Sequence, residues 1–128
     1  MNPVNAALAL TLAFSVGCGS KQLVAQGDTH LRERRPDAAA QYYQRALDKD
    51  PGHIEALRGI AEAHIAREQP VRAIIPAQRA VKAGDRASVR ILAKALLLTG
   101  RSEEALKAVR KGPEERPDNP AYRRLHVE

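Results

Sequence analysis

Tryptophan is absent from this chain of 128 residues, and the other aromatic residues are only Phe14, Tyr42, Tyr43 and Tyr122. The apolar content is mostly Ala and Leu, which favours closely packed helices over strands, where β-branched and aromatic residues prevail. Without Trp the chain offers no broad stacking platform for sugar rings. No aromatic residues alternate with its basic residues, as they do in proteins that bind single-stranded nucleic acid. We therefore expect an all-α protein that does not bind nucleic acid.

Cysteine occurs once, as Cys18, so no disulfide can form within the chain. No group of Cys and His residues has the spacing of a zinc site. The sequence also lacks a Gly-rich phosphate-binding loop and a nucleophile turn supported by Ser, His and Asp. These absences predict a protein that is not an enzyme and that holds no metal and no cofactor.

Charged residues are missing from positions 1–17, so the formal charge of +6 belongs entirely to the rest of the chain. Residues 6–16 (AALALTLAFSV) form an apolar run that is shorter than the ~20 residues of a bilayer-spanning helix. Its length is typical of the hydrophobic part of a signal peptide. After Ser20 the composition becomes polar and charged. The pattern predicts a cleaved signal peptide over 1–17 and a short N-terminal linker over 18–20.

The stretch 15–18 (Ser-Val-Gly-Cys) resembles a bacterial lipobox, in which the cysteine becomes the acylated first residue after cleavage. The resemblance implies that acyl chains on Cys18 hold the protein on a membrane of the bacterial cell envelope. Gly19 and Ser20, with no aspartate beside them, are similar to the context that directs lipoproteins to the outer membrane, facing the periplasm. Two alternatives stay open: an unmodified thiol in an ordinary secretory leader, and a start codon set too far upstream.

A pattern of small residues repeats along the chain, first after 34 residues and then after 32. Each unit reads as two helices, and the predicted helices are 21–34, 37–49, 53–67, 70–83, 86–98 and 102–111. The small residues that would let these helices pack closely are Gly27, Ala61 and Ala93, then Ala39, Ala73 and Ala105, then Ala46 and Ala80. A single hairpin cannot bury its own apolar face, so we expect the hairpins to stack on one another.

The segments 36–51 (PDAAAQYYQRALDKDP) and 100–106 (GRSEEAL) are similar to parts of the tetratricopeptide repeat. The resemblance covers about residues 20–119. It implies a right-handed superhelix of about three antiparallel helical hairpins, with repeats at 20–53, 54–85 and 86–119 in a domain over 21–119. Tyr122 and Leu125, spaced three residues apart, predict a short C-terminal helix over 120–128 that caps the last hairpin.

In that family the first helices of successive repeats line a concave groove that binds another protein or a peptide. The residues of these helices that face away from the predicted packing positions are Lys21, Val24, Asp28, Leu31 and Arg32, then Glu55, Arg58, Glu62 and Ile65, then Arg90, Lys94, Leu97 and Leu98. This mixture would suit a segment with apolar anchors and acidic groups. For Leu97 and Leu98, packing against the capping helix is an equal alternative. The clamp by which some family members hold a terminal carboxylate is not expected, because its Lys, Asn and Arg are not at the corresponding positions.

The resulting hypothesis is a non-catalytic scaffold or assembly factor of the bacterial cell envelope. Its partners would be another protein and, through the N-terminal lipid, the membrane. The alternative is an accessory subunit of an envelope enzyme or of a secretion or polysaccharide system. His30 and His64 lie one repeat apart and are interpreted as packing residues, because stacked hairpins hold such positions about 10 Å apart, too far to share a metal.

Overall fold

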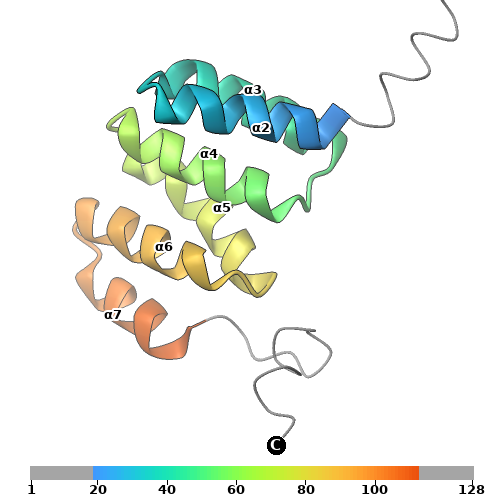
Figure 1. The fold of residues 1–128 in the computed structure, drawn as a ribbon. Coiled ribbons are helices and arrows are strands. Elements are labelled where there is room, and N and C mark those ends of the chain that lie inside the picture. Colours follow the sequence, from blue (N-terminus) through green and yellow to red (C-terminus); the bar gives the residue numbers. More distant parts are fainter. Residues whose placement is uncertain (1–18, 113–128) are drawn as a thin grey trace, which may run out of the picture.

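The computed structural model describes residues 19–112, and every regular element in this part of the chain is an α-helix. The helices are α2 (Gly19–Arg32), α3 (Pro36–Lys49), α4 (Ile54–Ala66), α5 (Pro70–Lys82), α6 (Arg86–Leu98) and α7 (Ser102–Lys111). They form three antiparallel hairpins, α2–α3, α4–α5 and α6–α7, stacked in chain order (Figure 1). The predicted all-α helical repeat is thus confirmed. The predicted signal peptide over 1–17, Cys18 and the predicted capping helix over 120–128 lie outside the described residues.

The turn inside each hairpin has the same backbone geometry. One residue adopts a positive φ, and the next donates its N–H to a carbonyl five residues earlier, a common way to end a helix. The positive-φ residues are Arg34 (59°), Glu68 (59°) and Gly100 (76°). The hydrogen bonds run from Arg35 to His30, from Gln69 to His64 and from Arg101 to Leu96, at 2.8, 2.9 and 2.8 Å. These positions follow the 34- and 32-residue shifts of the small residues, so the backbone confirms the repeat register independently.

Small residues lie at the contacts between helices. The repeated small residues predicted to pack are all buried, and the alanines among them are between 0% and 8% exposed. One apolar cluster around Tyr43 joins α2, α3 and α4, and a second around Leu92 and Leu96 joins α4, α5, α6 and α7. Each large apolar side chain buried in this way stabilises the fold by about 1.5–3 kcal/mol. Helix α4 contributes residues to both clusters, so buried apolar contacts occur in every hairpin.

The first helices of neighbouring hairpins contact each other, α2 with α4 and α4 with α6. The second helices pack mainly against first helices, α3 against α2 and α4, and α5 against α4 and α6. Because the first helices are the closer set, they form the inner side of the stack and the second helices form the outer side. This arrangement puts one face of α2, α4 and α6 side by side.

Candidate protein-binding groove

Two hollows adjoin on the inner side of the stack. One is lined by α2 together with Glu62 of α4, and the other by α4 and α6 together with Leu31 of α2. Leu31 and Glu62 line both hollows, so the two form one depression, called here the concave groove. Its residues are Ala25, Asp28, Thr29, Leu31, Arg32, Glu62, Ile65, Ala66, Arg90, Ile91 and Lys94.

The structure brings together part of the residue set that the sequence predicted for the groove. The predicted residues that line it are Asp28, Leu31, Arg32, Glu62, Ile65, Arg90 and Lys94. They share one side of their helices because residues three or four apart lie on the same helix face. Ala25, Thr29, Ala66 and Ile91 line the groove as well and were not predicted to do so.

The α6 end of the groove combines positive charge with an apolar floor. Arg90 and Lys94 lie one helical turn apart, and both are exposed. Neither has an ion pair or hydrogen bond to another side chain within residues 19–112. They line the same hollow as the apolar residues Leu31, Ile65 and Ile91 and share it with one acidic residue, Glu62. This end can therefore pair with carboxylates while the floor buries an apolar side chain of the same ligand.

Tyr43 of α3 reaches the groove from the core behind it. The residue is fully buried, and its ring occupies the space beside Gly27 of α2 and Gly59 of α4. Its hydroxyl donates a hydrogen bond of 2.5 Å to the carboxylate of Asp28. Burial and, second, this hydrogen bond raise the pKa of Tyr43 far above that of a free tyrosine, so the phenol remains a donor. The bond fixes Asp28 at the rim of the groove.

Val24 was wrongly predicted to face the groove. It is only 7% exposed and belongs to the apolar cluster around Tyr43. The reason is that α2 is covered on two sides, by α3 and by α4, so its buried stripe is wide enough to include both Leu23 and Val24. The sequence projection assumed a single covered side for this helix.

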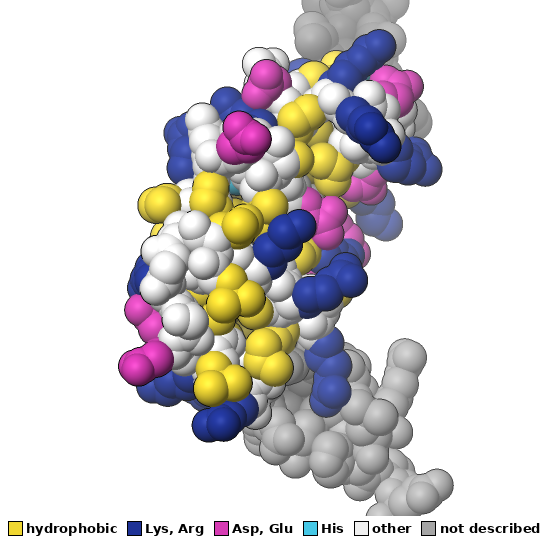
Figure 2. All heavy atoms as spheres, turned by 90° about the vertical axis from the view of Figure 1, so that its left-hand side faces the viewer, with side chains coloured by type: hydrophobic (Ala, Val, Ile, Leu, Met, Phe, Trp, Pro, Cys, Tyr) yellow, Lys and Arg dark blue, Asp and Glu magenta, His cyan; other side chains and the backbone are white. Residues whose placement is uncertain are grey.

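Three other predicted residues are accessible but line neither hollow of the groove. Lys21 lies in the first turn of α2 and is exposed. Leu97 and Leu98 end α6 with exposed fractions of 58% and 57%. They lie at the end of α6, directly before the turn to α7. Figure 2 views one side of the stack, on which apolar side chains form a band over the hairpins. The alternative interpretation of this pair, packing against residues 120–128, concerns a segment outside the described part.

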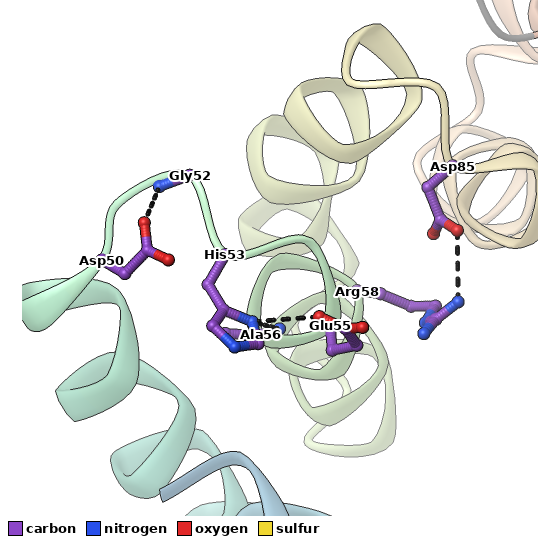
Figure 3. Close-up of polar contacts among 7 residues, drawn as sticks. All are labelled: Asp50, Gly52, His53, Glu55, Ala56, Arg58 and Asp85. Atoms are coloured by element: carbon purple, nitrogen blue, oxygen red, sulfur yellow. Dashed lines mark hydrogen bonds and ion pairs between the residues drawn. The ribbon is translucent and has the colours of Figure 1, made fainter. Parts of the chain in front are cut away.

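Glu55 and Arg58 were also predicted for the groove and instead have partners at the opposite end of α4. The carboxylate of Glu55 lies 3.2 Å from Nδ1 of His53, which also accepts a hydrogen bond from the N–H of Ala56 (Figure 3). Arg58 forms an ion pair of 3.2 Å with Asp85, at the start of α6 (Figure 3). The pair of Arg58 and Asp85 joins α4 to the start of α6, whereas the contact of Glu55 with His53 is local to the start of α4. Neither Glu55 nor Arg58 lines the two hollows of the groove.

Residues 19–112 contain neither a cluster that could hold a metal ion nor a helix that could span a membrane. No three His, Cys, Asp or Glu side chains there are grouped so that they could hold a metal ion. The ring of His30 stacks on Tyr42 at 5.1 Å, and His64 is 9% exposed with Arg67 at 3.4 Å, so both histidines contact neighbouring side chains. None of the helices in this part has the length and apolar character required to cross a bilayer.

The comparison with known families agrees with this architecture. A tetratricopeptide repeat family model matches residues 24–88, from α2 to the beginning of α6. A second tetratricopeptide repeat model matches residues 77–127. The chain belongs to the tetratricopeptide repeat family. No curated protein matches it significantly.

Tetratricopeptide repeats are protein-binding modules, and the two matched family models describe such repeats and no catalytic domain. Membership therefore supports a role in binding another protein or a peptide. It also accounts for the regular shifts of 34 and 32 residues, because each repeat contributes one helical hairpin.

Proposed function

We propose that this protein is a scaffold or assembly factor that holds another protein of the bacterial cell envelope in its concave groove. The observation that carries the proposal is the α6 end of the groove, where Arg90 and Lys94 stand beside the apolar side chains of Leu31 and Ile65. Cations without a side-chain partner among residues 19–112, next to an apolar floor, favour a ligand segment that carries an acidic residue close to an apolar anchor.

The shape of the groove also favours a segment rather than a small molecule. The two hollows follow one another across α2, α4 and α6, so a ligand that fills both must be extended or helical. Of the charged groove residues, Asp28 and Arg32 lie on α2 and Glu62 lies on α4, whereas Arg90 and Lys94 on α6 are both basic. A ligand with an acidic group toward α6 would match this distribution.

In-cell photo-cross-linking tests the groove directly. A photoreactive amino acid replaces Thr29 or Ala66, which are exposed groove residues. Matched controls carry the same group at Arg45 or Arg110, which are exposed on the second helices α3 and α7. We expect a discrete cross-linked protein from both groove positions and from neither control. Equal cross-linking from all four positions, or none from the groove, would refute the assignment.

We further propose that the protein is anchored by lipid on Cys18 after removal of residues 1–17, with the outer membrane as its location. This part rests on the apolar run 6–16 and on the lipobox-like stretch 15–18. Mass spectrometry of the mature N-terminus tests it separately from the groove. An acylated Cys18 as first residue is the expected result. An unmodified Cys18, or an intact Met1, would exclude the anchor and leave the groove assignment unaffected.

A further inference from the structure

The last hairpin presents a face with three exposed apolar side chains, called here the end face. Leu97 of α6 is 58% exposed, and Leu106 and Val109 of α7 are 52% and 57% exposed. Within the described part, α6 is the only helix against which α7 packs substantially. Exposed apolar residues gathered in this way on a small protein mark a surface that binds something.

The counterparts of Leu106 and Val109 in the earlier repeats are covered. Leu106 corresponds to Ala40 and Ile74, which are 6% and 4% exposed, and Val109 corresponds to Tyr43 and Ala77, which are fully buried. Leu97 corresponds to Leu31 and Ile65, which are only partly buried and also line the concave groove. In the first two repeats the covering element is the first helix of the next hairpin, α4 or α6. The end face is therefore shaped for one more helix of that kind.

The chain itself contains a segment with the required pattern. Near the start of α6, Ser88 and Leu92 are buried and Val89 is partly buried, and their α4 counterparts Ala56, Leu57 and Ile60 are at most 3% exposed. A further shift of 33 residues, between the two observed shifts, leads from these α6 residues to Ala121, Tyr122 and Leu125. The same shift leads from Asp85, directly before α6, to Asp118.

The length of the chain agrees with this register. The hairpins are joined by residues 50–53 and 83–85, and the chain continues from Gly112 to residue 128. This is enough for a connection and a helix of about ten residues that begins after Asp118. The second tetratricopeptide repeat match also extends to residue 127. The residues between and after the apolar positions are Arg123, Arg124, His126, Val127 and Glu128, and all of them except Val127 are polar or charged and suit the solvent side of a terminal element.

We infer that the end face binds residues 118–127 of the same chain, with Tyr122 and Leu125 covering Leu106 and Val109. This inference concerns the end of the stack and does not depend on the proposed groove ligand. It assigns the exposed apolar residues of α7 to an intramolecular contact instead of a partner protein.

Cross-linking of paired cysteines tests the contact in the full-length chain with Cys18→Ser. The test pair is Leu106→Cys with Leu125→Cys, treated with a short bis-maleimide. The control pair is Arg45→Cys with Leu125→Cys, because Arg45 lies on α3 in the first hairpin. The expected result is a cross-link within one chain for the test pair and none for the control. A cross-link between two chains would assign the end face to a second copy of the protein. The absence of a cross-link would show that residue 125 does not lie near residue 106. Either result would overturn the inference.

Hydrogen exchange gives a second readout that does not require a cross-linker. In full-length protein, Tyr122→Glu/Leu125→Glu should speed exchange of the α7 amides by about tenfold, which corresponds to about 1.4 kcal/mol of lost local stability. The matched control Arg123→Glu/Arg124→Glu changes the solvent side of the same segment and should leave α7 exchange unchanged. Equal effects of the two double variants, or no effect of either, would contradict the contact.

Discussion

The ring of Tyr43 occupies the space that a side chain at Gly59 would need. A Cβ atom built on Gly27 would lie 2.7 Å from the Cε1 atom of this ring, and one built on Gly59 would come closer still. Gly27 and Gly59 have no side chain, and α2 and α4 can therefore both approach the ring of Tyr43, although they belong to different hairpins. The contact joins the first two repeats and positions the Tyr43 hydroxyl against Asp28 in the groove.

Gly59→Ala should therefore destabilise the protein although alanine is the better helix former. Alanine in place of glycine within a helix stabilises by up to about 1 kcal/mol, but forcing a methyl group against a packed ring costs about 1–3 kcal/mol. Urea unfolding measures the difference. Gly52→Ala is the matched control, because the nearest atom to its added Cβ is 3.8 Å away, and it should be close to neutral. A Gly59→Ala variant as stable as the wild type would show that the ring can move aside.

The hairpin turns predict a substitution that stabilises the protein. Glu68 holds a φ of 59°, which is strained for a residue with a side chain, and its counterpart in the third repeat is Gly100. Glu68→Gly should raise the free energy of unfolding by about 0.5–1 kcal/mol. The reverse change, Gly100→Ala, should lower it by a similar amount, because a Cβ there meets no atom within 4 Å and only the backbone is strained. Thermal unfolding of both variants checks the opposite signs.

The ion pair between Arg58 and Asp85 should contribute measurably to stability because it is partly shielded. The two side chains are 32% and 13% exposed, and the carboxylate of Asp85 also accepts a hydrogen bond from the buried Ser88 hydroxyl. Arg58→Met should cost about 1 kcal/mol. Asp85→Ala should cost more, about 2 kcal/mol, because it leaves the Ser88 hydroxyl without its acceptor. Arg101→Met breaks an exposed pair with Glu104 and serves as the control with no measurable loss. Equal losses for all three variants would contradict this ranking.

His64 makes the stability depend on pH. Burial, and then the nearby Arg67 and Arg72, lower its pKa from the ordinary value of 6.5. The unfolded chain therefore binds a proton more readily than the folded one, so stability should fall as the pH drops below about 6.5. His64→Leu, which introduces the residue found at the equivalent position 96, removes this contribution. The difference in thermal midpoint between wild type and variant should change between about pH 7.5 and 5; a constant difference would exclude His64 as the cause.

Most of the fold could be predicted from the sequence because the small residues mark the helix contacts. The predicted helices 86–98 and 102–111 have the observed bounds, and the other helix ends differ by at most two residues. The largest difference is α2, which begins and ends two residues earlier than predicted. Its C-terminal turn is set by Arg34, a residue whose identity gives no sign of a positive φ, whereas Gly100 signalled the equivalent turn.

The groove was predictable only in part because helical projection shows one face and not what covers it. It identified Leu31, Ile65 and Lys94 but included Val24, which is buried in the apolar cluster around Tyr43. It also included Arg58, which forms an ion pair with Asp85 and does not line the groove. Both placements depend on packing in three dimensions, which a single helix projection does not show. The role of Tyr43 was missed for the same reason, although glycines at 27 and 59 were a usable sign of a large side chain opposite them.

The most direct test of the account reverses the charges of Arg90 and Lys94 at the α6 end of the groove. Full-length Arg90→Glu/Lys94→Glu and the control Arg45→Glu/Arg110→Glu change the net charge equally, and all four residues are exposed. Circular dichroism first verifies that both variants remain folded, and each is then purified from detergent-solubilised cells with its bound proteins. The account predicts that the groove variant loses a partner that wild type and control retain. Retention of the same proteins by all three would contradict it.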